Sequence, residues 1–137
     1  MVAPDALARL ALFGDLAAPE LAAVAQLMDE ASYTRESRVL REGISTNAFY
    51  VILDGEAAVL IDGSERARLH AGDFFGEISI LTAEPTGADV VAVSEELRCA
   101  TLPGAELRPL LLEHPHIAVR MLDAGARRLR AANLWAG

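Results

Sequence analysis

Two Asp-Gly pairs, each at the end of a short apolar run, constrain the fold of this chain more than any other feature. Residues 49–53 stop at Asp54-Gly55, and residues 57–61 stop at Asp62-Gly63. An Asp-Gly pair supplies the positive φ angles that a tight hairpin turn needs. Short apolar runs bounded by such turns are typical of antiparallel strands. The middle of the chain is therefore predicted to be a region of β-hairpins.

Alternation of apolar and polar residues extends this strand pattern on both sides of an interruption. The period of two begins at Tyr33 and is lost over residues 72–87. It returns in residues 89–94 and 97–102, until Pro103 ends it. The predicted order is strands, an insertion, and further strands.

Helical spacing of apolar residues marks both ends of the chain. Near the start it predicts two helices separated at Gly14-Asp15, and near the end a helical region broken at His114-Pro115. With 137 residues, the chain has room for one core and one site. We therefore predict a single domain, mainly β with flanking helices: N-terminal helices in residues 1–30, strands in residues 31–103 and C-terminal helices in residues 104–137.

Composition excludes several classes of function. No apolar run approaches the roughly 18 residues of a membrane span. The N-terminus lacks the pattern of a secretory signal, so a cytoplasmic location is expected. Cys99 is the only cysteine and is predicted to be a buried structural thiol. The net charge of −8 disfavours direct nucleic-acid binding. A local group of arginines lies near the end of the chain: Arg120, Arg127, Arg128 and Arg130. We interpret it as a solvated helix face in preference to a binding patch.

The insertion carries the most chemical information. It reads Gly72-Asp73-Phe74-Phe75-Gly76-Glu77-Ile78-Ser79-Ile80-Leu81. Its two glycines permit sharp turns of the backbone, and the apolar residues after them suit a short helix. The first N–H groups of such a helix would point back toward the strands and form an anion site.

Embedded between hairpins and followed by Pro85, this stretch resembles the phosphate-binding cassette of cyclic nucleotide-binding domains. Those domains occur in catabolite-activator-type regulators and in kinase regulatory subunits. The resemblance covers nearly the whole chain, including Arg41-Glu42-Gly43, residues 49–55 and the long C-terminal helix. It implies a double-stranded β-helix, a jelly-roll-like β-roll, with the cassette at residues 72–90. It also implies a regulatory, ligand-sensing domain that is not an enzyme.

The resemblance assigns roles to the cassette residues. It implies that Glu77 accepts the ribose 2′-hydroxyl of a nucleotide and that N–H groups around Ile78 and Ser79 face the cyclic phosphate. Where the family has an arginine that pairs with this phosphate, this chain has Thr86; where the family has a Ser or Thr, it has Asp89. The candidate ligand-binding residues are Gly76, Glu77, Ile78, Ser79, Thr86, Gly87, Ala88 and Asp89.

The two departures lie on the phosphate side of the cassette. A charge-assisted hydrogen bond contributes roughly 1.5–3 kcal/mol, which is about one to two decades in affinity. Asp89 adds repulsion. Cyclic nucleotide is therefore expected to bind weakly if it binds, and no cofactor is assigned. One alternative is a working sensor in which Arg66, Arg68 or an arginine of the last helix compensates. Another is the sensor half of a transcription regulator that lacks its helix-turn-helix.

Other site chemistry is weak in this sequence. Asp73, Glu77 and Asp89 supply oxygen ligands suited to calcium or magnesium, but their spacing matches no calcium loop. His114 and His116 flank the helix break, where a capping or surface role is expected. Ser79 lacks the glycine-flanked elbow of hydrolases. No metal site and no catalytic residue is predicted.

The C-terminal helix has two apolar stripes. One recurs at steps of four and three, the spacing of a seam that packs on a partner helix. It consists of Ala118, Leu122, Gly125, Leu129 and Ala132. The adjacent stripe consists of Ile117, Met121 and Ala124. Packing onto the chain's own β-roll and pairing in a homodimer or with a partner protein both remain open.

Overall fold

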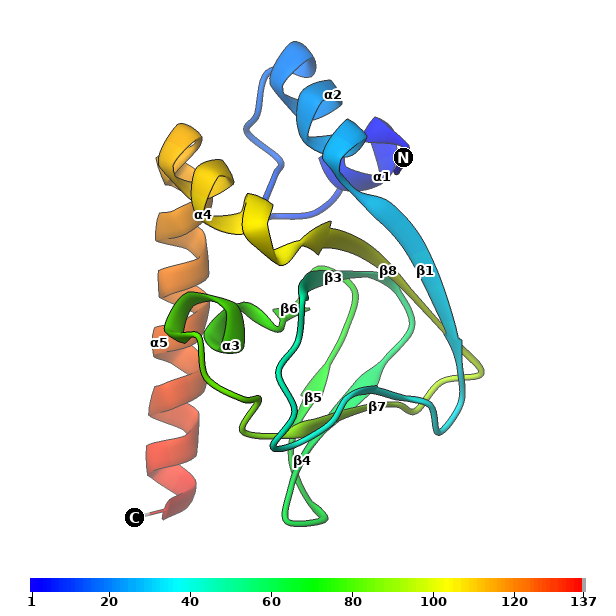
Figure 1. The fold of residues 1–137 in the computed structure, drawn as a ribbon, viewed down its shortest axis with the longest axis vertical. Helices are drawn as coiled ribbons and strands as arrows, with labels where there is room; N and C mark the ends of the chain where they lie inside the picture. The colour runs from blue at the N-terminus through cyan, green and yellow to red at the C-terminus, as the bar shows by residue number, and fades with distance from the viewer. Residues whose placement is uncertain (137) are drawn as a thin grey trace.

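The computed structural model describes the backbone of residues 1–136 and the side chains of residues 1–132. Helices lie at both ends of the chain, and one short helix interrupts the strands (Figure 1). The helices are α1 (Pro4–Ala8), α2 (Ala18–Leu27), α3 (Glu77–Thr82), α4 (Gly104–Glu113) and α5 (Pro115–Ala136). The strands are β1 (Asp29–Thr34), β2 (Arg38–Leu40), β3 (Ala48–Asp54), β4 (Ala57–Ile61), β5 (Ser64–Leu69), β6 (Phe74–Phe75), β7 (Asp89–Ala92) and β8 (Glu96–Pro103).

The strands form two antiparallel four-stranded sheets, in the orders β1-β8-β3-β6 and β2-β7-β4-β5. The predicted mainly β class with flanking helices is confirmed. Consecutive strands often fall in different sheets, as β3 and β4 do and as β7 and β8 do. The chain thus winds between two facing layers, which is the arrangement of a β-roll.

One of the two predicted hairpins is correct and the other is wrong. Asp62 and Gly63 both have positive φ, 51° and 79°, and join β4 to β5 in one sheet. At the other pair only Gly55 has positive φ, 97°, and the chain crosses there from one sheet to the other. A Cβ at Gly55 would lie 2.7 Å from Ser94 Oγ. The glycine therefore serves a close backbone crossing.

The boundary between the N-terminal helices and the first strand also differs from the expectation. β1 begins at Asp29, whereas alternation in the sequence begins at Tyr33. None of its residues is buried, because β1 is an edge strand paired only with β8. An edge strand with no fully buried side chain leaves little hydrophobic pattern to detect.

The apolar core has two parts. One lies between the β1-β8-β3-β6 sheet and the helices, where Phe13, Phe49 and Leu107 are fully buried. The other fills the interior of the roll around Ile52, Leu97 and Cys99. Burial raises the pKa of the Cys99 thiol to about 12, which makes this thiol unreactive at neutral pH. The prediction of a buried structural cysteine is confirmed.

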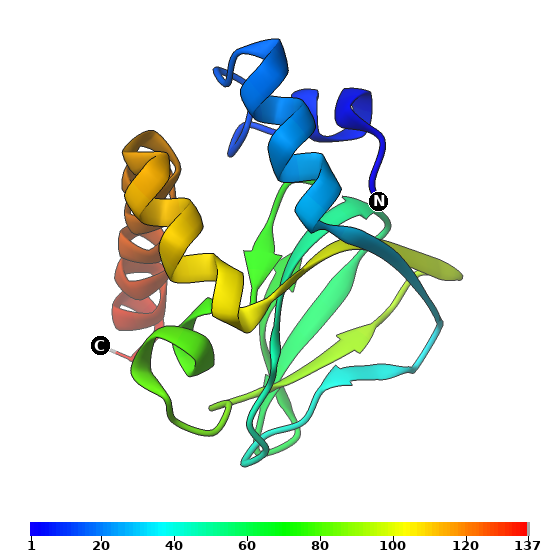
Figure 2. The ribbon, with the colours of Figure 1, turned by 45° about the horizontal axis from the view of Figure 1, so that its top comes forward.

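The two stripes of α5 have different environments. Ile117 and Met121 are buried in the helix-side core, so the inner stripe packs on the chain itself. Leu122 is 72% exposed and Leu129 is 63% exposed. Figure 2 shows α5 standing beside the roll, with α3 and α4 next to it. Within residues 1–136, no helix has the length and apolarity that a membrane crossing requires.

Candidate functional site

The cassette helix α3 is positioned by the glycine that precedes it. Strand β6 pairs Phe75 with Tyr50 of β3, and Gly76 then turns the chain at a φ of 94°. A Cβ at Gly76 would lie 2.8 Å from the carbonyl oxygen of Ala48. Only glycine combines this φ with this close approach, so the start of α3 is fixed against β3.

Glu77, the first residue of α3, faces α5. With Phe74 and Arg128 it lines a mainly apolar hollow of about 760 Å³ between α3 and α5. Burial raises the pKa of the Glu77 carboxyl, and the nearby positive charge of Arg128 offsets part of this effect. The carboxyl predicted to accept a ribose hydroxyl is thus a partly desolvated group at the wall of a hollow.

Arg128 brings the last helix to the cassette. Its guanidinium donates a hydrogen bond of 2.9 Å to the carbonyl oxygen of Phe74, and its Cζ lies 4.6 Å from the centre of the Phe74 ring. Among the three arginine sources that the sequence leaves open, Arg68 is bound to Glu65 and Arg66 is exposed on β5. The last helix is therefore the one that reaches the cassette, at the Glu77 end.

The next two cassette residues have opposite exposures. The Ile78 side chain is 72% exposed. Ser79 is buried, and its hydroxyl donates to the carbonyl oxygen of Glu84. This bond closes the loop that follows α3, so the Ser79 hydroxyl is already used within the protein.

Thr86 is turned into the protein. It is 8% exposed, and its hydroxyl lies within hydrogen-bonding distance of the carbonyl oxygens of Arg41 and Ile44. Its backbone N–H donates to the Ile44 carbonyl at 3.1 Å, and its carbonyl accepts from Gly43 at 2.8 Å. The residue in place of the expected arginine thus ties the end of the cassette to the turn at residues 41–44.

Asp89, at the start of β7, is bonded to the same turn. Its Oδ1 accepts a 2.7 Å hydrogen bond from the backbone N–H of Glu42, and its Oδ2 lies 3.7 Å from Nε of Arg38. Between Thr86 and Asp89, Gly87 is exposed and Ala88 is half-buried. The carboxylate expected at position 89 is present, but the backbone N–H of Glu42 and the side chain of Arg38 lie next to it.

The three carboxylates considered for a metal are not brought together. Asp73 Oδ2 accepts the backbone N–H of His70 at 2.7 Å and so closes the turn before β6. Glu77 faces α5, while Asp89 faces the 41–44 turn. Throughout the described part of the chain, no group of three His, Cys, Asp or Glu side chains lies close enough to hold a metal ion.

Sequence reasoning missed the contacts that give these residues their surroundings. Arg38 beside Asp89, and the carbonyls of Arg41 and Ile44 beside Thr86, are more than 40 positions away along the chain. The Arg41-Glu42-Gly43 motif was the available signal, but it says nothing about its bonding partners. These pairings depend on how the two sheets face each other.

The raised pKa of Glu77 leads to a testable pH dependence. The folded state binds this proton more tightly than the unfolded state, so the stability from protonation is present below about pH 4.5 and is lost as pH rises through the raised pKa. We expect Glu77→Gln to become progressively more stable relative to the native chain as pH rises above about 4.5 and through the raised pKa of Glu77. Urea unfolding at several pH values measures this difference. Glu84→Gln, at an exposed position, is the control, and a difference that does not change with pH contradicts the prediction.

Comparison with known proteins identifies relatives of several kinds. A family model described as "Cyclic nucleotide-binding domain" matches residues 30–114. A putative potassium channel protein of Rhodopseudomonas palustris is 38% identical over 114 residues, which is 81% of this chain and 27% of that protein. A CRP-like cAMP-activated global transcriptional regulator of Mycobacterium tuberculosis is 28% identical, over 94% of this chain and 59% of that protein.

A solved structure shares the fold. The regulatory subunit of a cAMP-independent protein kinase A from Trypanosoma cruzi, bound to guanosine, superposes with a TM-score of 0.70. It is 24% identical, and the match covers 80% of this chain and 39% of that one. The chain therefore spans between about a quarter and three-fifths of the length of these proteins.

Proposed function

This chain belongs to the cyclic nucleotide-binding domain family, and we propose that it is a regulatory ligand-sensing domain whose cassette has lost tight binding of cAMP and cGMP. The proposal rests chiefly on one observation, the buried Thr86 at the position of the phosphate arginine. Regulatory domains act through other proteins or domains, so we propose no catalytic role for any residue. The relatives are longer than this chain, so the domain or protein that would receive the signal is not assigned.

The contacts of Thr86 support the loss of phosphate binding. A hydroxyl has one proton to donate, and the carbonyls of Arg41 and Ile44 compete for it. Even if that proton were freed, a neutral hydroxyl does not compensate the charge of a phosphate. A charge-assisted bond is about twice as strong as a neutral one. The position therefore lacks both the charge and an uncommitted donor.

Asp89 acts in the same direction, with a smaller effect than its charge alone would give. Arg38 is near one carboxylate oxygen, and the backbone N–H of Glu42 donates to the other. Both contacts reduce the repulsion of an approaching phosphate. The replacement still supplies no donor, because an ionised carboxylate only accepts hydrogen bonds.

A compensating arginine is the main alternative, and Arg128 is its strongest candidate. Its guanidinium is bound to the Phe74 carbonyl and lies on the Phe74 ring, near Glu77. Thr86 and Asp89 are bonded to the turn at residues 41–44 instead. Arg128 is thus at the end of the cassette where the family resemblance places the ribose, which favours loss of phosphate binding over compensation.

Ligand-induced stabilisation distinguishes these possibilities. With about 1 mM ligand, a Kd of about 1 μM stabilises the folded state by about 4 kcal/mol, whereas a Kd near 1 mM adds less than about 0.5 kcal/mol. We expect cAMP and cGMP to leave the melting temperature nearly unchanged. Guanosine has the ribose without the phosphate, so it tests whether the Glu77 side alone supports binding. A rise of several degrees with cAMP or cGMP would favour the compensated sensor.

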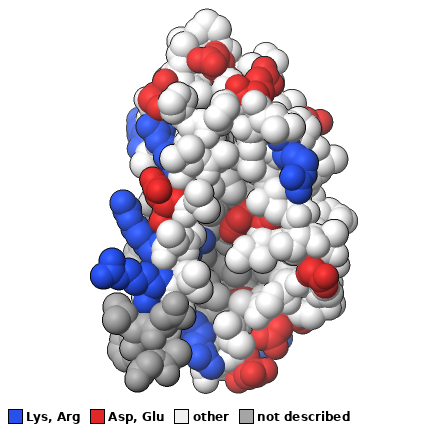
Figure 3. Space-filling view, turned by 90° about the vertical axis from the view of Figure 1, so that its left-hand side faces the viewer, with Lys and Arg blue, Asp and Glu red and all other residues white. Residues whose placement is uncertain are grey.

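The outer stripe of α5 favours a second function, assembly through this helix. Leu122 and Leu129 project from α5 with Gly125 between them and Ala118 one turn before Leu122, and a Cβ at Gly125 would meet nothing within 4 Å. Figure 3, which faces this side, shows an uncharged band beside basic side chains. Spacing of four and three with small residues between leucines suits close pairing with a second α5. We propose a homodimer, with a partner helix as the alternative.

Charge placed on the stripe tests this assembly. Because Leu122 and Leu129 are exposed in the single chain, Leu122→Glu with Leu129→Glu should preserve the fold while excluding a helix partner. Light scattering on a sizing column is expected to show a dimer for the native chain and a monomer for the variant. Arg127→Gln, at an exposed position outside the stripe, should remain dimeric. If the native chain is a monomer even at high concentration, the homodimer proposal is wrong.

A further inference from the structure

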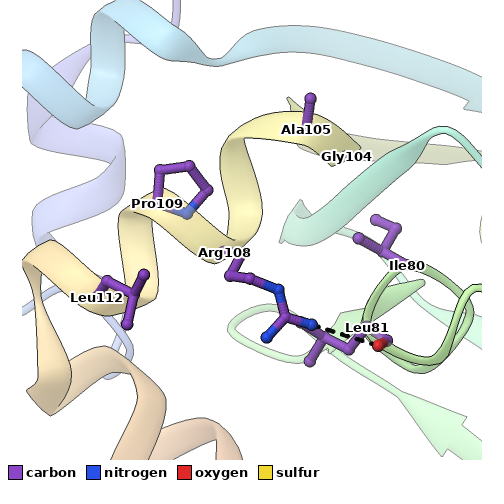
Figure 4. A pocket seen from close by; sticks show the side chains of 7 residues that line it. All are labelled: Ile80, Leu81, Gly104, Ala105, Arg108, Pro109 and Leu112. Atoms are coloured by element: carbon purple, nitrogen blue, oxygen red, sulfur yellow. Dashed lines mark hydrogen bonds between the residues drawn. The ribbon is translucent and has the colours of Figure 1, made fainter.

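A hollow between α3 and α4 combines an apolar wall with one fixed positive charge. Its volume is about 370 Å³. Figure 4 shows the Arg108 side chain extending from α4 toward Leu81 of α3, with Ile80 beside Leu81, and with Pro109 and Leu112 along α4. Leu112 is 76% exposed, so it adds an accessible apolar side chain to the wall of this hollow.

Arg108 is held in place without a negative partner. Its guanidinium donates a 3.3 Å hydrogen bond to the carbonyl oxygen of Leu81. No carboxylate within residues 1–132 forms an ion pair with it. Acidic residues outnumber arginines 20 to 12, and several arginines do pair with them. Those paired arginines are Arg38, Arg68, Arg98 and Arg120. Arg108 is therefore a preorganised cation that is available to an external carboxylate.

A second hollow adjoins the first and supplies polar groups. Its volume is about 530 Å³, and it shares Ile80, Gly104 and Ala105 with the Arg108 hollow. Its other wall includes Ser45 and Asn47, both exposed at the turn before β3. The two hollows thus form one trough with hydrogen-bonding side chains at one end and apolar side chains with a cation at the other.

The chemistry of the trough indicates the kind of partner that fits. An extended peptide presents backbone N–H and C=O groups to polar side chains while its own side chains enter apolar hollows. A volume of about 370 Å³ accommodates one or two apolar side chains. A carboxylate next to such a side chain would meet Arg108, forming a charge-assisted bond. The net charge of −8 makes unspecific attraction of acidic segments weak, so binding would depend on this local match.

We propose that the α3–α4 trough binds a short linear segment of a partner protein in which an apolar side chain stands beside an aspartate or glutamate. The apolar side chain occupies the hollow between Leu81 and Leu112, and the carboxylate pairs with Arg108. The trough lies outside the contacts of Thr86 and Asp89, and Ile80 and Leu81 of the cassette helix α3 form part of its wall.

Selection from a random peptide library tests the proposal directly. A phage-displayed library of dodecamers is selected on the native chain, and the enriched sequences are synthesised as fluorescent peptides. We expect them to share an apolar residue beside an acidic one. Arg108→Glu should weaken their binding by about tenfold or more, because it replaces an attraction with a repulsion. Leu112→Asp should weaken it as well.

Arg127→Glu is the matched control, because it makes the same charge change at an exposed position of α5 outside the trough. Its peptide affinity should equal that of the native chain, and thermal melting confirms that each variant is folded. The proposal is overturned if no peptide is enriched, if enriched peptides lack acidic residues, or if they bind Arg108→Glu as well as the native chain. The proposal is also overturned if the native chain self-associates through the trough, so that peptides cannot reach it.

Discussion

A double variant, Thr86→Arg with Asp89→Thr, should bind cAMP or cGMP at least about tenfold more tightly than the native chain. The arginine would supply the missing charge-assisted bond, which contributes roughly 1.5–3 kcal/mol. Removing the Asp89 carboxylate eliminates a repulsion, and threonine keeps an oxygen that can accept from the backbone N–H of Glu42. Calorimetric titration of both proteins measures the gain.

The gain must come from position 86 and not from added charge alone. Gly87→Arg with Asp89→Thr is the matched control, because Gly87 is exposed and a Cβ there meets nothing within 4 Å. It carries the same net charge but places the guanidinium one residue away. The double variant also loses the hydroxyl contacts of Thr86 with Arg41 and Ile44, at a cost of about 1–2 kcal/mol of stability. A folded double variant with unchanged affinity would contradict the importance given to Thr86.

Gly76→Ala should be the most destabilising small change in the cassette, at about 2–4 kcal/mol. Alanine at a φ of 94° is strained, and its Cβ would also lie 2.8 Å from the Ala48 carbonyl oxygen. That oxygen belongs to β3, which is held between β6 and β8, so it cannot move away at low cost. Urea unfolding measures the loss.

Gly72→Ala separates the two causes of this loss. Gly72 has nearly the same φ, 93°, but a Cβ there would meet nothing within 4 Å. It should therefore show the conformational cost alone, about 1–2 kcal/mol. If the two variants lose equal stability, the contact between Gly76 and β3 does not position α3.

Much of the fold could be predicted from local patterns. The Asp62-Gly63 hairpin, the short helix after Gly76 and the helix break at Pro115 all follow from turn residues and apolar spacing, which act over a few positions. The Asp54-Gly55 pair was assigned wrongly because the same dipeptide also suits a crossing between sheets. Which of the two occurs depends on where Glu96 and Leu97 return, which is a long-range property.

The site could be predicted only in part, for the same reason. The sequence identifies Thr86 and Asp89 as departures from the family pattern, and it identifies the last helix as a source of arginine. It does not show that both departures bond to the turn at residues 41–44, or that Arg128 lies on Phe74. These contacts connect segments that are distant in the sequence. Through them, the two substituted residues, Thr86 and Asp89, form one network with the turn at residues 41–44.

That network leads to the central claim, that the fold of the family is kept while the phosphate side of its cassette is used for internal contacts. The most direct test is calorimetric titration of the native chain with cAMP and with cGMP. We expect no binding tighter than about 1 mM, because neither Thr86 nor Asp89 supplies a positive charge or a free donor. A dissociation constant of about 1 μM or below for either nucleotide would contradict the claim.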